Sequence, residues 1–298
     1  MKKRMRRAML GVVLGTIACS SDHMGTGPVA SRLAFTVQPS AATAGVAITP
    51  GIQITAYDDA GVVVTSFSGT ITVALAANPN GATLSGTLTR GAVGGVATFS
   101  DLRLNRTGSG YTFVASSGAL TTATSGGFTI APAPPVQLAF IVQPSDVIAG
   151  ATMAPAVQVQ ARDSLGNATP GFTGSVTLTL APNGTGAVLA GPTTLTAVAG
   201  VAAFPGLHVD KSGSGYAIQA ASGALAAATS TAFKVSATVA KRLTVVLQPS
   251  PPNPVAGQPM QVQVAALDTF DNTATGFGGS VSIALGANPP GGALSGTT

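Results

Sequence analysis

Apolar and polar residues alternate with a period of two along much of this chain. Residues 71–75 read Ile-Thr-Val-Ala-Leu, and the same alternation recurs at residues 176–180 and 281–285. A period of two places successive side chains on opposite faces of a strand, so each segment is predicted to be a strand with one buried face. Four more segments show the alternation, at residues 52–56, 111–115, 157–161 and 216–220.

Turn-forming residues separate these predicted strands. Clusters of Gly, Pro, Asn and Ser interrupt the alternation about every ten residues, for example at residues 77–81 and 107–110. After the first 19 residues, no segment has the 3.6-residue period of an amphipathic helix. Short strands with turns at this spacing predict an all-β fold, built from antiparallel two-sheet β-sandwiches.

The sequence also repeats itself. Residues 32–40 recur at 137–145 and again at 242–250, an offset of 105 both times. A unit of this length corresponds to one domain, so we expect tandem domains at residues 32–131 and 137–236. Residues 242–298 match only the first half of the unit, and half a sandwich leaves an apolar face and strand edges uncovered. We therefore expect an incomplete third domain at 242–298, and we expect the chain to be a fragment of a longer protein.

The N-terminus has the organisation of a secretory signal peptide. Five basic residues within residues 1–7 precede an apolar stretch of eleven residues, 8–18. A membrane-spanning helix needs about 20 apolar residues, so residues 1–18 are predicted to be a signal peptide and the protein to be exported. Residues 19–31 are predicted to be a flexible tether.

Cys19, the single cysteine of the chain, follows directly on Thr16-Ile17-Ala18. This segment resembles a bacterial lipobox, with Thr16 where Leu is preferred. The resemblance implies that Cys19 is lipidated and anchors the protein to a membrane, which we expect to be the outer membrane. The alternative is ordinary cleavage after Ala18, with Cys19 unmodified.

Charge and composition exclude several classes of function. The formal net charge is +5, but five of the 14 basic residues lie in residues 1–7, and the nine that remain balance nine Asp. The excess of basic residues therefore belongs to the segment that directs export, and we expect no nucleic-acid partner. Glu and Trp are absent, and the two His, His23 and His208, lie in no cluster of ligands. We accordingly expect no catalytic residues, no cofactor and no enzymatic activity.

Three carboxylates occupy a repeating position: Asp58, Asp163 and Asp268. An Asp that opens a turn between strands usually accepts hydrogen bonds from the amides of its own turn, and we expect that role here. The alternative is a calcium site at joints between domains, which requires six to eight oxygen ligands and several carboxylates.

Four segments of the first unit, at residues 32–37, 57–61, 95–102 and 108–111, resemble bacterial immunoglobulin-like domains of the invasin/intimin type. The turn Asp-x-x-Gly-Asn of that family stands intact at residues 163–167, whereas Val62 replaces its Asn in the first copy and Asp271 its Gly in the third. The resemblance covers residues 32–298 and implies a bacterial surface protein. Tyr111 and Tyr216 are each expected to form a structural tyrosine corner.

These observations predict a non-catalytic protein of the cell envelope, exposed at the cell surface, whose tandem repeats act in cell adhesion or as a spacer. Its partners would be the membrane, through Cys19, and an unidentified surface glycan or protein. The alternative is an accessory region of a longer extracellular enzyme or polysaccharide-binding protein.

Overall fold

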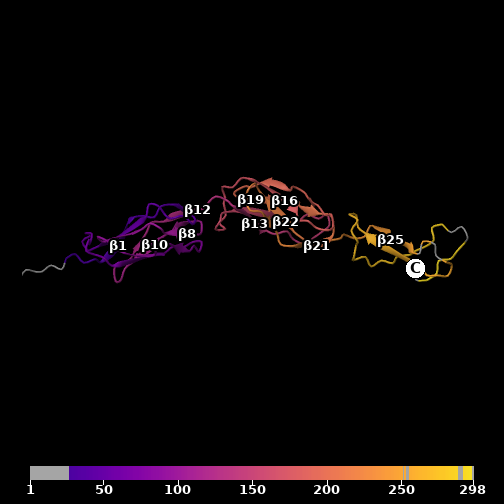
Figure 1. Ribbon diagram of the computed structural model, residues 1–298, viewed down its shortest axis with the longest axis horizontal. Coiled ribbons are helices and arrows are strands. Elements are labelled where there is room, and N and C mark those ends of the chain that lie inside the picture. Colours follow the sequence, from indigo (N-terminus) through magenta and orange to yellow (C-terminus); the bar gives the residue numbers. More distant parts are fainter. Residues whose placement is uncertain (1–26, 251, 253–254, 288–290, 297–298) are drawn as a thin grey trace, which may run out of the picture.

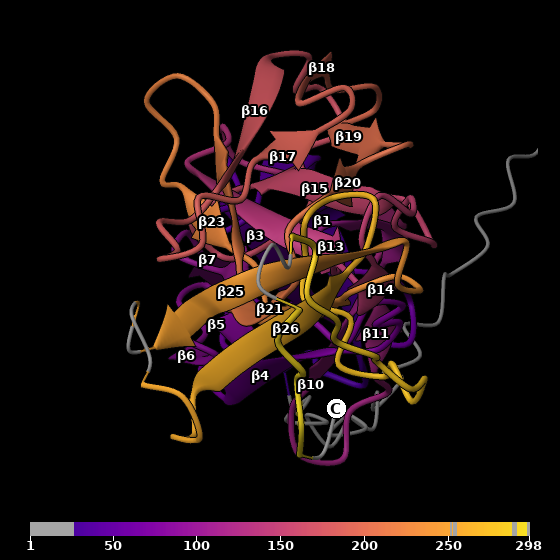
Figure 2. The ribbon, with the colours of Figure 1, turned by 90° about the vertical axis from the view of Figure 1, so that its right-hand side faces the viewer.

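The computed structural model describes residues 27–298, except for residues 251, 253–254, 288–290 and 297–298. The described residues form three units that follow one another in a row (Figure 1). When the molecule is viewed along this row, the third unit lies in front of the other two (Figure 2). The predicted signal peptide, Cys19 and His23 lie outside the described residues.

The first unit is built from twelve short strands between residues 32 and 131. They are β1 (Arg32–Val37), β2 (Ala42–Thr43), β3 (Ile52–Tyr57), β4 (Thr70–Leu75), β5 (Leu84–Ser85), β6 (Thr89–Gly91), β7 (Val96–Phe99), β8 (Arg103–Leu104), β9 (Gly108–Tyr111), β10 (Phe113–Ser116), β11 (Ala123–Thr124) and β12 (Phe128–Ala131).

Two antiparallel sheets of this unit contribute to one core. Their strand orders are β1-β3-β7 and β11-β10-β4-β6. A smaller sheet has the order β2-β12-β9, in which β2 is parallel to β12, and β5 pairs with β8. The all-β antiparallel sandwich expected from the alternation is confirmed.

Burial follows the alternation of the sequence. In β4, Ile71 and Val73 are buried while Thr70 and Thr72 are exposed. Their apolar side chains belong to the same core cluster as those of β3 and β10, which also contains Phe113. Because alternate side chains of each strand enter this cluster, the two sheets cover each other's apolar faces.

The second unit reproduces the first strand by strand. Each strand begins and ends 105 residues after its counterpart: β13 (Gln137–Val142), β14 (Val147–Ile148), β15 (Val157–Arg162), β16 (Ser175–Leu180), β17 (Leu189–Ala190), β18 (Thr194–Thr196), β19 (Val201–Phe204), β20 (His208–Val209), β21 (Gly213–Tyr216), β22 (Ile218–Ala221), β23 (Ala228–Thr229) and β24 (Phe233–Ser236). The second unit has a separate core cluster. The described residues of the first two units therefore form tandem immunoglobulin-like sandwiches.

The third unit contains one strand pair among its described residues, β25 (Arg242–Ser250) with the antiparallel β26 (Gln261–Leu267). The strand predicted at residues 281–285 is wrong, because the structure has no strand there. In the first unit the equivalent strand, β4, is held between β6 and β10. Among the described residues of the third unit, no counterpart of β6 or β10 is present for segment 281–285 to pair with.

None of the described residues forms a helix, and so no helix there is long and apolar enough to cross a membrane.

Candidate functional site at the joints between units

The repeating Asp lies in the turn that follows β3 in the first unit, β15 in the second and β26 in the third. Oδ1 of Asp163 accepts hydrogen bonds from the backbone N–H groups of Leu165 (2.9 Å) and Asn167 (2.8 Å). Oδ1 of Asp268 is bonded in the same way by the amides of Phe270 and Asn272. These bonds are the turn capping that the sequence suggested.

The second carboxylate oxygen of each Asp contacts the linker that arrives from the preceding unit. Oδ2 of Asp163 accepts the N–H of Ala133 at 3.2 Å, and Oδ2 of Asp268 accepts the N–H of Thr238 at 2.9 Å. Each carboxylate therefore ties its own turn to the linker, a role that the sequence did not reveal.

Asn167, the last residue of the turn, reaches across the joint to the first unit. Its Nδ2 donates to the carbonyl oxygen of Asn105 (3.0 Å) and to Oδ2 of Asp163 (3.0 Å). Its Oδ1 accepts the backbone N–H of Thr107 at 3.3 Å. One buried side chain thus joins the turn of the second unit to the loop between β8 and β9 of the first.

The second joint repeats this arrangement with different residue types. Nδ2 of Asn272 donates to the carbonyl oxygen of Asp210 (2.8 Å) and to Oδ2 of Asp268 (3.0 Å), while its Oδ1 accepts the N–H of Ser212 (2.8 Å). Lys211 adds a hydrogen bond from Nζ to the carbonyl oxygen of Phe270 at 2.6 Å. The bonding pattern is therefore a property of the repeat.

An apolar contact accompanies the polar ones. At the first joint, Leu165 lies against Gly45, where an added Cβ would be 3.0 Å from Cδ1 of the leucine. At the second joint, Phe270 lies against Gly150, and an added Cβ would be 2.4 Å from its Cζ. Both glycines have a left-handed backbone, with φ of 78° and 75°. The left-handed backbone therefore favours glycine at this point, and the small residue also lets the side chain of the next unit approach closely.

The hydrogen bonds at the joint also determine the ionisation of the two carboxylates. Burial raises the pKa of Asp268, but donors from Asn272, Thr238 and Phe270 outweigh it and lower the pKa to about 2. The pKa of Asp163 is lowered by the same balance of burial against hydrogen bonds. Both carboxylates are therefore ionised at neutral pH, in the form that accepts these bonds.

The corner tyrosines shape the loop that receives the asparagine. The hydroxyl of Tyr111 donates to the carbonyl oxygens of Arg106 (3.1 Å) and Thr107 (3.3 Å), and burial raises the pKa of that hydroxyl. The hydroxyl of Tyr216 donates likewise to Lys211 and Ser212. Both tyrosines thus fasten the segment on which the next unit docks, the arrangement of a tyrosine corner.

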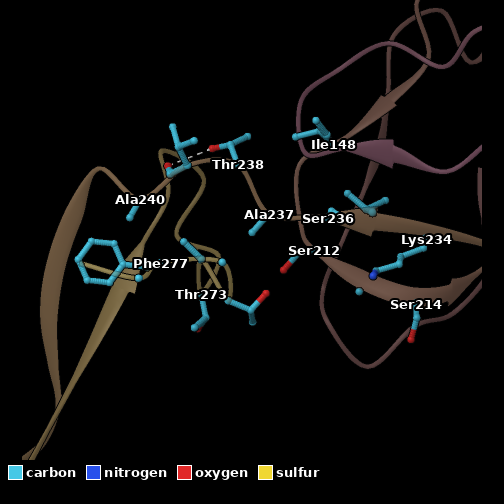
Figure 3. Close-up of a pocket in the computed structure, with 17 residues that line it drawn as sticks. Ile148, Ser212, Ser214, Lys234, Ser236, Ala237, Thr238, Ala240, Thr273 and Phe277 are labelled. Carbon is cyan, nitrogen blue, oxygen red and sulfur yellow. Dashed lines mark hydrogen bonds between the residues drawn. The ribbon is translucent and has the colours of Figure 1, made fainter. Parts of the chain in front are cut away.

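A crevice opens beside each joint. The one at the second joint has a volume of about 910 Å³, and side chains of both units line it (Figure 3). Ser212, Lys234 and Ser236 lie on the side of the second unit, and Thr273 and Phe277 on the side of the third. The crevice at the first joint is smaller, about 540 Å³, and includes the linker prolines and Phe172.

Potential metal ligands do not gather at these joints. Within the part of the chain that the structure describes, no group of three or more His, Cys, Asp or Glu is placed to hold a metal ion. His208 is half-buried in β20, with Nδ1 3.1 Å from the carbonyl oxygen of Gly206. Calcium binding at Asp58, Asp163 or Asp268 stays a hypothesis for experiment.

The fold defines a protein of tandem immunoglobulin-like domains. No protein-family model matches the chain, and no curated protein matches it. Among solved structures it is similar to FdeC, an Escherichia coli adhesin, with 17% identity over 83% of this chain and 77% of that one and a TM-score of 0.37. Invasin, a bacterial integrin-binding protein, matches with 17% identity over 82% and 47% of the chains and a TM-score of 0.34. A beta-glycosidase from Bacteroides vulgatus matches with 12% identity, 69% and 25% coverage and a TM-score of 0.32. The chain thus spans about half of the invasin structure and a quarter of the glycosidase.

Proposed function

We propose that this protein is an exported, non-catalytic component of a bacterial cell envelope, in which tandem immunoglobulin-like units form a stalk. The stalk is anchored through a lipid on Cys19 and holds its distal part away from the membrane. Its exposed loops and strand edges are available for weak contacts with a surface glycan or protein.

The observation that carries this proposal is the repetition of the joint. A turn Asp, a turn Asn, a linker amide and a glycine make equivalent contacts at both joints. Units joined only by a free linker would change their relative orientation by default. Equivalent hydrogen bonds at successive joints instead favour a stiff end-to-end row, which is what a spacer requires.

The composition of the units supports a non-catalytic role. Only 8% of the residues are charged, and the side chains after residue 18 sum to zero. The strand positions that face solvent are largely Thr, Ser and Ala, with hydroxyl pairs such as Thr72 with Thr89 and Thr177 with Thr194. A neutral hydroxyl surface of this kind avoids strong nonspecific binding.

Cell fractionation tests the anchor. The wild-type protein should sediment with membranes and be degraded when intact cells are treated with a protease. The Cys19→Ser variant should be released or retained as a soluble protein, and a Cys19→Ser protein that stays in the membrane fraction would contradict lipid anchoring. Mass spectrometry of the N-terminus provides a second readout, because an unmodified Cys19 would rule out the lipid.

A binding screen separates adhesion from spacing. The purified protein is applied to an array of glycans and matrix proteins at 0.15 M salt. Binding to one class of ligand, lost on cleavage of the units, would support adhesion by the repeats themselves. The absence of binding to the array would support the spacer role, in which the distal part held by the stalk makes the contacts.

A further inference from the structure

At one position of the repeating turn, the residue type differs between units that contact a preceding unit and the unit that contacts none among the described residues. The fourth residue after the turn Asp is Asn167 in the second unit and Asn272 in the third, and each faces a preceding unit. In the first unit the residue is Val62. The backbone of this residue behaves alike in all three turns. Its N–H donates to Oδ1 of the turn Asp, as it does from Val62 to Asp58 at 2.8 Å in the first unit.

The geometry of the asparagine explains why this position matters. The two N–H bonds of the Asn167 amide are shared between Asp163 in its own turn and the carbonyl of Asn105 in the preceding unit. Its oxygen accepts from Thr107, also in the preceding unit. The side chain of valine has neither a donor nor an acceptor, so it cannot form any of these bonds.

Solvent exposure at this position follows the same division between the units. Asn167 and Asn272 are each 5% exposed, whereas Val62 is 56% exposed. Asp163 and Asp268 are fully buried beside their linkers, whereas Asp58 is only half-buried. Among the described residues, no linker amide donates to Asp58 as Ala133 does to Asp163.

We infer that the residue at positions 62, 167 and 272 determines whether the leading end of a repeat is a docking surface. The leading end is the end of a repeat that carries this turn and faces the preceding repeat. With Asn, it binds the loop of the preceding repeat that corresponds to the β8–β9 loop, where a backbone carbonyl and an N–H are available beside a left-handed glycine. With Val, as in the first unit, the turn makes no such contact with any of the described residues. The inference concerns contacts between repeats and does not depend on export or lipidation.

A distance measurement on the full-length chain tests this inference. Spin labels are attached to cysteines introduced at the exposed positions Thr70 and Ser175, in a Cys19→Ser background so that no other thiol reacts. Double electron–electron resonance then reports the spread of distances between the first and second units. The test variant is Asn167→Val, which installs the residue that the first unit already tolerates at this position.

Two matched substitutions serve as controls. Asn272→Val makes the same chemical change at the other joint, and Val62→Asn makes the reverse change in a turn that contacts no other unit among the described residues. Both should leave the distance distribution between the first and second units unchanged. Thermal unfolding of each variant verifies that the units stay folded.

We expect Asn167→Val to broaden the distribution and to raise the undocked population at least about tenfold, because two hydrogen bonds between units are lost. A distribution as narrow as that of the wild type would overturn the inference. If Asn167→Val unfolds the second unit, Asn167→Ala removes the same polar atoms without a branched Cβ. An Asn167→Ala chain with a wild-type distribution would overturn the inference equally.

Discussion

Removal of one hydroxyl, in the variant Tyr111→Phe, tests whether the corner tyrosine fastens the loop at the joint. Tyr111 is fully buried, and its ring packs against Phe128 with 6.0 Å between centroids. Phenylalanine preserves this packing, so the substitution removes only the hydrogen bonds to Arg106 and Thr107. Arg106 is exposed and Thr107 is half-buried, and the carbonyl oxygen of Thr107 keeps a second donor, Nδ2 of Asn80 at 2.7 Å, so part of the lost bonding is replaced.

The expected cost is therefore near the middle of the usual range for one hydrogen bond, about 1 kcal/mol. For a domain of this size, 1 kcal/mol lowers the melting temperature by about 4–8 °C. The loss should be confined to the first unit, while the loop at residues 105–107 should exchange its amide hydrogens faster. Because Asn167 docks on that loop, amides of the turn at residues 163–167 should also lose protection.

Hydrogen exchange followed by mass spectrometry at increasing temperature resolves the units separately. Tyr57→Phe is the matched control, because the hydroxyl of Tyr57 forms no hydrogen bond within the described residues; its effect should stay within about 0.5 kcal/mol. Equal stability of Tyr111→Phe and Tyr57→Phe would refute the role assigned to the corner. A loss of stability in the first unit that leaves the amide protection of turn 163–167 unchanged would refute the link from corner to joint.

Other hydrogen bonds of the first unit and of the joints can be tested in the same way. Ser125→Ala should destabilise the first unit by about 1–3 kcal/mol in chemical denaturation, because Oγ accepts the N–H of buried Phe113 at 2.9 Å; the exposed Ser109→Ala should have little effect. The stabilising contribution of Asp268 should be complete above about pH 4, the pKa of its carboxyl in the unfolded chain, and should disappear as the pH falls toward about 2. Backbone amides at the joint, followed by NMR, should therefore stay protected from exchange at about pH 5 and lose protection near pH 2. Calcium or a chelator should leave thermal melts unchanged, because both oxygens of Asp163 and of Asp268 already accept N–H groups; a calcium-dependent rise in melting temperature would indicate a metal site instead.

Much of the fold could be predicted from local sequence patterns. The alternation at residues 71–75 and 176–180 identified β4 and β16, because burial of one face of a strand leaves a period of two in the sequence. The same pattern failed at residues 281–285, which have no neighbouring strand to pair with among the described residues. Alternation reports the face that a strand would bury, but a strand also needs hydrogen-bonding partners on its edges.

The joints could be predicted only in part. The repeating Asp163 and Asp268 marked the turn, and their capping bonds are local, so sequence spacing was enough to suggest them. The contacts of Asn167 with Asn105 and Thr107 join residues about 60 positions apart. Nothing in the sequence of one unit specifies that its turn contacts a loop of the preceding unit. The presence of Val62 where the other two copies have Asn was the one sign in the sequence that this position matters.

Small-angle X-ray scattering of the full-length protein tests the central claim, that fixed joints hold the units in a stiff row. Two units of about 100 residues followed in a row by a shorter third should have a radius of gyration of roughly 30 Å, whereas a compact globule of the same length would have about 19 Å. Fixed joints should give the larger value and the decay in scattered intensity typical of a rod, both unchanged between about 0.05 and about 0.5 M salt. A radius near 19 Å, or scattering typical of units that reorient freely, would contradict the central claim.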